Sequence, residues 1–192
     1  MSPQLLSSLP FRSTFIAVLV AFAVAPSLPF SDNASAQAAT TSTFTAFADT
    51  YASGAEPDRN FGTSTSIRTD ASPDLRSFIR FDPDGLSGSI SQARLRVFAN
   101  SSNATGIDVR GVTSSSWGET TLTYRNMPGT LGVTSSSGPI STGTWVEWNV
   151  TSLVSNNDPV SFALTSTSST ATNLASRESS NKPQLTVTFE SG

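Results

Sequence analysis

The chain has 192 residues, no cysteine, no histidine and a formal net charge of −3 at pH 7. The absence of cysteine excludes a disulfide framework, and the absence of histidine removes the commonest general base and the commonest transition-metal ligand. The mildly acidic balance disfavours nucleic acid and anionic membranes as general partners.

The first 38 residues are expected to be a secretory signal peptide. Arg12 is the only charge ahead of an apolar run over 15–25, which is too short to span a bilayer and has the length of a signal h-region. Small-residue cleavage patterns follow and end at Ala38. We expect residues 39–42 to be a flexible N-terminus. We expect 43–192 to form a single domain that is secreted into the extracellular space, monomeric and free of the membrane after cleavage.

Short β-rich runs recur through the rest of the chain, and no stretch shows sustained helical periodicity. The predicted strands, in chain order, cover 43–51, 66–70, 76–82, 90–99, 106–113, 144–151, 160–165 and 184–189. The long segment 114–138 has little regular alternation and is expected to be a loop. Strands of this spacing, separated by polar turns, indicate an all-β fold, an antiparallel β-sandwich of the jelly-roll type.

Two of the predicted strands carry most of the candidate ligand-binding side chains. Alternation over 76–82 and 93–99 gives each strand an apolar face and a face rich in arginine and phenylalanine. If both strands lie in one sheet, their arginine- and phenylalanine-rich faces combine into one surface. Trp145 would be part of that surface. Arg68, Arg110 and Tyr124 would extend it. The candidate ligand-binding residues are Arg76, Phe78, Arg80, Arg94, Arg96, Phe98 and Trp145.

Such a surface suits an acidic sugar. The paired N–H donors of a guanidinium group match a carboxylate, and an aromatic ring matches the apolar face of a pyranose. The alternative is structural, because acidic residues occupy neighbouring outward positions and would neutralise the arginines as cross-strand pairs. These acidic residues are Asp70, Asp82, Asp108 and Glu147.

The long loop carries polar residues that are expected to brace it. Glu119 and Asn126 can satisfy its backbone donors, and Arg177 with Glu178 is expected to form a similar internal pair. Two catalytic alternatives remain open. Glu119 and Glu178 would act as acid and base, or Tyr124 would act as the base of a lyase.

A structural Ca²⁺ ion is the only cofactor that the sequence suggests. Glu56, Asp58 and Asn60 place oxygen side chains at alternate positions before Gly62, as in an acidic calcium loop, and Asp49 would contribute from elsewhere in the fold. The glycine falls one position later than in an EF-hand, and no bidentate glutamate follows at the required spacing.

A series of motifs occurs in a fixed order along the chain. They are ADTY at 48–51, NFG at 60–62, RSFIRFD at 76–82, ARLRV at 93–97, WGETTLTYRNMP at 117–128, WNVT at 148–151, SRE at 176–178 and PQL at 183–185. In this order and spacing the chain resembles the DNRLRE domain family, also called disaggregatase-related, over residues 43–190. It departs from that pattern at Asn149 and Leu174, where an aspartate and an aromatic residue are usual.

The resemblance implies a β-jelly roll that binds polysaccharide, since part of the family is classed as carbohydrate-binding modules with alginate as a recognised ligand. We therefore expect a secreted, non-catalytic protein that binds a uronate-containing polysaccharide. The alternatives are a structural or adhesive protein of the cell surface or biofilm matrix without sugar binding, and a small polysaccharide lyase. Family domains are usually appended to an enzyme, whereas here the domain follows the signal peptide directly, which favours a free-standing protein.

Overall fold

The computed structural model describes residues 38–190, which lie in one compact unit, Ala36–Gly192. Residues 1–37 of the expected signal peptide, which covers 1–38, lie outside the described residues. No helix within 38–190 is long and apolar enough to cross a membrane. The elements of this part of the chain are β1 (Ala39–Thr45), β2 (Ala48–Ser53), β3 (Ser66–Ala71), β4 (Asp74–Phe81), β5 (Ile90–Phe98), β6 (Asp108–Val112), β7 (Thr130–Ser136), β8 (Trp145–Asn149), the 3₁₀ turn η1 (Thr151–Leu153), β9 (Val160–Thr165), β10 (Thr172–Ala175) and β11 (Gln184–Glu190).

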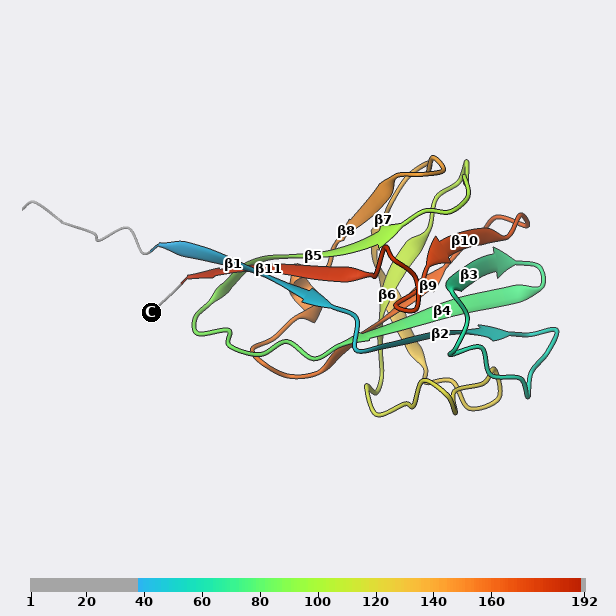
Figure 1. Cartoon of the computed structure of the whole chain (residues 1–192), viewed down its shortest axis with the longest axis horizontal. Coiled ribbons are helices and arrows are strands. Elements are labelled where there is room, and N and C mark those ends of the chain that lie inside the picture. Colours follow the sequence, from blue (N-terminus) through green and yellow to red (C-terminus); the bar gives the residue numbers. More distant parts are fainter. Residues whose placement is uncertain (1–37, 191–192) are drawn as a thin grey trace, which may run out of the picture. The chain divides into compact units, whose positions relative to one another are not determined.

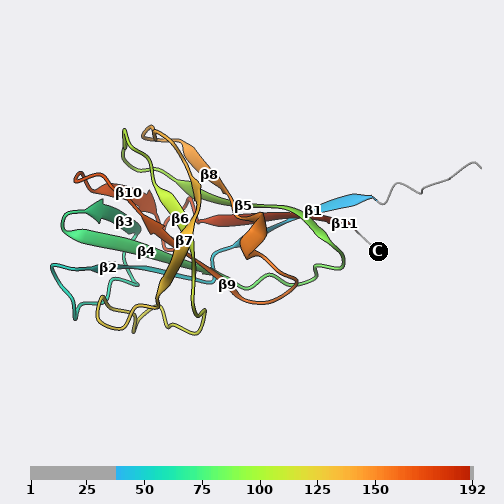
Figure 2. The same ribbon diagram turned by 180° about the vertical axis from the view of Figure 1, so that it is seen from behind.

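These strands form two antiparallel sheets (Figures 1 and 2). One sheet has four strands in the order β1-β11-β5-β8, and the other has seven, in the order β10-β3-β4-β9-β6-β7 with β2 paired to β4. The chain passes repeatedly from one sheet to the other, as it does after β1, β4, β5, β7, β8 and β10. The predicted all-β antiparallel sandwich is confirmed.

The main core lies between the two sheets and follows the predicted alternation. Ile79 and Phe81 of β4 meet Leu95 and Val97 of β5 in one buried cluster, which also contains Trp148 of β8. All five side chains are at most 1 % exposed. Burial of large apolar side chains contributes about 1.5–3 kcal/mol each, so this cluster is the main stabilising feature of the sandwich.

A second, smaller core lies on the outer side of the seven-stranded sheet. The long loop after β6 lays Trp117 and Leu122 over Phe78 of β4 and Ala163 of β9. Phe78, which alternation predicts to face outward, is therefore fully buried. Alternation detects the inner face of β4 correctly but gives no sign that a distant loop covers the other face.

Three expected segments differ in the structure. Residues 39–42, expected to be a flexible N-terminus, belong to β1 and pair with β11, Ala39 lying opposite Glu190. The predicted strand 43–51 is divided between β1 and β2, and the expected loop 114–138 contains β7. Each strand pairs with a segment distant in sequence, which short-range patterns cannot reveal.

Candidate functional site

The two arginine-bearing strands lie in different sheets. β4, with Arg76 and Arg80, belongs to the seven-stranded sheet, whereas β5, with Arg94 and Arg96, belongs to the four-stranded sheet. Because the outer faces of a sandwich point in opposite directions, the predicted common surface does not form. The candidate residues instead fall into separate groups with different contacts.

The first group lies on the outer side of the four-stranded sheet. We call it the β5–β8 face, and it consists of Arg94, Arg96, Phe98, Trp145 and Glu147. Arg96 lies opposite Glu147, and Phe98 lies opposite Trp145. The two rings meet edge to face with their centroids 5.6 Å apart, and both are partly exposed. The face therefore presents two arginines beside an aromatic pair.

Glu147 orients both arginines of the β5–β8 face. Its Oε1 accepts a hydrogen bond from Nε of Arg96 at 2.7 Å, and its Oε2 lies 3.6 Å from Nη1 of Arg94. Nη1 of Arg96 also donates to Gln184 at 3.1 Å, and the guanidinium carbon lies 5.1 Å from the centroid of the Trp145 ring. No hydrogen bond within residues 38–190 uses Nη2 of either arginine, so these donors remain for a ligand.

On β4, the side chains of Phe78 and Arg80 serve the covering loop. Phe78 is 0 % exposed and packs edge to face on Trp117, so the prediction that it contacts a ligand is wrong. Nη1 of Arg80 donates to the backbone carbonyls of Ser115 and Trp117 at 3.0 and 2.8 Å. The same guanidinium lies 4.8 Å from the exposed ring of Phe47. Arg80 thus holds the loop against the sheet.

Arg76 lines a hollow beyond the end of that loop. The hollow, which we call the Arg76–Arg110 groove, has a volume of about 680 Å³. Its lining residues are Ala71, Asp74, Arg76, Asp108, Arg110, Thr130, Thr165, Ser166 and Thr167. Nε of Arg76 donates to both carboxylate oxygens of Asp74 at 3.1 and 2.9 Å. The groove therefore combines fixed charges with hydroxyl groups.

Three of the four predicted calcium ligands have other partners. Glu56 pairs with Arg59 at 2.7 Å, and Asp58 pairs with Arg125 at 2.6 Å. The side-chain amide of Asn60 donates to two backbone carbonyls of the long loop, each at 2.7 Å. Each of the three side chains therefore has a protein partner, and their role as calcium ligands stays a prediction.

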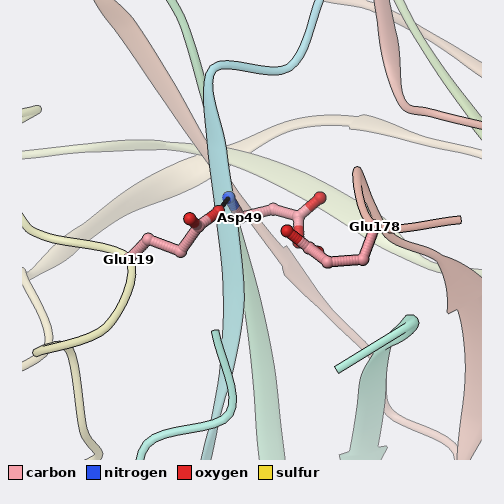
Figure 3. A group of neighbouring side chains, drawn as sticks. All are labelled: Asp49, Glu119 and Glu178. Atoms are coloured by element: carbon pink, nitrogen blue, oxygen red, sulfur yellow. Dashed lines mark hydrogen bonds between the residues drawn. The ribbon is translucent and has the colours of Figure 1, made fainter. Parts of the chain in front are cut away.

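The fourth predicted ligand, Asp49, lies in a cluster of three carboxylates with Glu119 and Glu178 (Figure 3). One oxygen of each lies within 4.8 Å of the others. Nη1 of Arg177 donates to Glu119 at 2.7 Å and to Glu178 at 3.2 Å, and its backbone N–H donates to Asp49 at 2.7 Å. We call these four residues the Arg177 cluster. Each carboxylate of the Arg177 cluster accepts at least one N–H group and keeps further oxygen lone pairs, and the calcium ion expected at Asp49 stays a prediction.

Burial raises the pKa of Asp49 from 3.8 to about 8. Asp49 is 1 % exposed, and removal from water disfavours its charged form more strongly than the hydrogen bond from the Arg177 backbone favours it. The nearby carboxylates of Glu178 and Glu119 raise the pKa further. Asp49 is therefore mostly protonated at neutral pH in the folded protein.

A family model described as carbohydrate-binding module family 96 matches residues 40–189, which run from β1 to β11. The chain belongs to carbohydrate-binding module family 96. A comparison with curated proteins gives no match. Membership of family 96 confirms the predicted carbohydrate-binding role and indicates a binding domain rather than a catalytic one. The narrower resemblance to the DNRLRE family stays a prediction.

In this member of family 96, the contacts of Tyr124 do not suit the base that a lyase would need. Its hydroxyl donates to Asp74 at 2.8 Å, and this hydrogen bond raises the pKa of Tyr124. A general base works best when its pKa lies near the operating pH, so a raised tyrosine pKa acts against this role. The observation agrees with a non-catalytic domain.

Sequence reasoning missed the full Arg177 cluster of the family 96 domain. The motifs marked Glu119 as a brace and Arg177 with Glu178 as an internal pair. The 3.2 Å contact between Arg177 and Glu178 is present, but the pair is not internal, because Glu178 is exposed and Arg177 is only half-buried. Asp49, however, lies 70 positions from Glu119 and 128 positions from Arg177. No local pattern indicates that residues so far apart will meet.

Proposed function

We propose that this member of family 96 is a secreted protein whose β5–β8 face binds an acidic, uronate-containing polysaccharide such as alginate. The observation that carries the proposal is the presence of two arginines and two aromatic rings on one outer sheet face.

The charge of the β5–β8 face supports an acidic ligand. Arg94 and Arg96 against Glu147 leave a local charge of +1, in a chain whose net charge is −3. Guanidinium groups bind carboxylates through paired N–H donors, and Glu147 holds both groups in place before a ligand arrives. A uronate chain would therefore meet oriented donors on an otherwise acidic protein.

The spacing of the β5–β8 face suits a polymer. Arg94 and Arg96 are two residues apart on β5, which corresponds to about 7 Å along an extended strand. A polysaccharide lying along β5 would meet both arginines and then reach Phe98 and Trp145. The apolar parts of these rings can contact the apolar faces of sugar rings.

The proposal is tested by measuring binding of the purified protein to alginate, pectate, a neutral glucan and chitin at low and at raised salt. The variants Arg94→Ala, Arg96→Ala and Trp145→Ala alter the β5–β8 face. Arg125→Ala is the matched control, because it removes one positive charge from a loop side chain that is 67 % exposed.

We expect uronate binding that weakens with salt, since exposed charge interactions are screened. Arg96→Ala should weaken it about tenfold or more, because hydrogen bonds to charged groups contribute about 1.5–3 kcal/mol. Equal losses in Arg96→Ala and Arg125→Ala would contradict a specific site. Absence of binding to every polymer would favour the structural or adhesive alternative.

Export is part of the same proposal. β1 begins at Ala39, so cleavage after Ala38 would leave every described strand complete. N-terminal sequencing of protein recovered from the culture medium should find a start close to residue 39. A start inside β1, or retention of the first 38 residues, would contradict the predicted cleavage.

A further inference from the structure

We infer that the Arg76–Arg110 groove is a second carbohydrate-binding site, that it takes a neutral saccharide, and that the domain holds two different ligands on opposite faces. The inference uses membership of family 96 for the class of ligand. The saccharide site in the groove does not depend on the uronate preference proposed for the β5–β8 face, whereas the difference between the two ligands rests on that proposed function.

The groove lies on the outer side of the seven-stranded sheet. Its floor comes from β4, β9 and β6, where Asp108 pairs with Thr165 and Arg110 pairs with Ala163. The long loop that buries Phe78 on the same side of the sheet does not close the groove, whose lining includes no residue of 114–129. A ligand here would be separated from the β5–β8 face by the whole core.

The size of the groove fits a short saccharide segment. Its volume of about 680 Å³ lies within the range of about 300–1,000 Å³ that is usual for small-molecule sites. Among the described residues it is larger than the hollow of about 550 Å³ beside Phe47 and Arg80.

Both arginines of the groove are held in position before a ligand binds. Asp74 binds Nε and Nη2 of Arg76, and the Tyr124 hydroxyl donates to the same carboxylate. Nε of Arg110 donates to Thr165 at 3.1 Å, and Nη1 donates to the Leu131 carbonyl at 3.2 Å. Fixed side chains lose little conformational freedom on binding, which favours affinity.

Each arginine also keeps a terminal nitrogen for a ligand. No hydrogen bond within residues 38–190 uses Nη1 of Arg76 or Nη2 of Arg110. The Asp108 carboxylate, which accepts the Ser136 hydroxyl, adds acceptor capacity. Thr167 contributes a further hydroxyl to the lining. The groove therefore offers both donors and acceptors.

The charge of the groove favours a neutral ligand. The positive charges of Arg76 and Arg110 equal the negative charges of Asp74 and Asp108, so the lining has no net charge. Sugar hydroxyls donate and accept hydrogen bonds, and they match such a mixed lining. Because the lining has no net charge, it gives a uronate no net electrostatic attraction, unlike the β5–β8 face with its local charge of +1.

The test measures binding of a neutral glucan, chitin and alginate to the purified wild-type chain and to two groove variants. Arg110→Ala removes one of the oriented donors. Thr167→Trp fills the groove from an exposed wall residue that takes part in no hydrogen bond within 38–190. Arg94→Ala/Arg96→Ala is the matched double variant on the other face, and thermal unfolding verifies the fold of every variant.

We expect both groove variants to weaken binding of a neutral polymer about tenfold, with alginate binding unchanged. The β5–β8 double variant should show the reverse, and salt should affect only alginate binding. Unchanged neutral-polymer binding in Thr167→Trp, or no neutral-polymer binding by the wild type, would overturn the inference. Alginate binding by the same proteins tests the uronate proposal separately.

Discussion

Among residues 38–190, Asp49 is the residue whose ionisation depends most clearly on the fold. Its pKa rises from 3.8 to about 8 because the carboxyl group is buried. Between these values the folded protein binds more protons than the unfolded chain, so this group makes stability fall as pH increases from about 4 to about 8. Above about pH 8 the contribution of Asp49 to stability no longer changes with pH.

We expect Asp49→Asn to flatten this pH dependence. Asparagine is neutral at all pH values, and its side-chain oxygen can still accept the hydrogen bond from the Arg177 backbone. The melting temperature of the variant should therefore exceed that of the wild type most clearly near pH 8. Thermal unfolding across pH 4 to 9 measures this, with the exposed Asp158→Asn as control. Parallel curves for Asp49→Asn and the wild type would contradict it.

Phe78 gives a second prediction at the scale of single residues. It is 0 % exposed, whereas Phe47 is 56 % exposed. Phe78→Ala should lower the free energy of unfolding by about 3–5 kcal/mol, because it leaves a cavity beneath the long loop. Phe47→Ala should change it far less. Denaturant unfolding of the two variants distinguishes them, and similar losses would show that Phe78 is not buried in solution.

β1 carries the clearest prediction at the scale of elements. Residues 39–42 lie opposite Glu190 through Val187 of β11, and Phe44 of the same strand packs against the main core. Removal of 39–42 should lower the melting temperature by several degrees, because about four residues of strand pairing are lost. If residues 39–42 were a flexible N-terminus, the shortened protein would have the same melting temperature as the wild type.

The inner faces of the strands could be predicted from sequence, but the partners of the strands could not. Alternation correctly identified Ile79 and Phe81 on β4 and Leu95 and Val97 on β5 as core. It could not show that β5 pairs with β8 and β11 while β4 pairs with β9. Strand pairing is a long-range property, so the predicted arginine surface was divided between two sheets.

The candidate sites show the same limit. Arg94, Arg96, Phe98 and Trp145 were predicted together and do lie together, because each is an outward residue of adjacent strands. Phe78 satisfied the same pattern but is covered by a loop. Local alternation reports which way a side chain points from its strand, and it does not report what lies above it.

For the whole domain, two sites on opposite faces predict that one protein molecule can bridge two polysaccharides. The wild-type protein should capture a soluble neutral glucan on alginate beads, because one molecule would hold the bead through the β5–β8 face and the glucan through the groove. Arg94→Ala/Arg96→Ala should fail to bind the bead, and Thr167→Trp should bind the bead without capturing the glucan. Capture of glucan by the Thr167→Trp variant would contradict the two-site arrangement. Fluorescence of labelled glucan on washed beads provides the measurement.

The antiparallel pairing of β1 with β11 determines how the domain responds to mechanical force. Ala39 lies opposite Glu190, so tension applied between these two residues would open the β1–β11 ladder one pair at a time. A ladder loaded in this way resists weakly, because each step breaks few hydrogen bonds. Such a module would yield readily when stretched between its two ends, from Ala39 to Glu190.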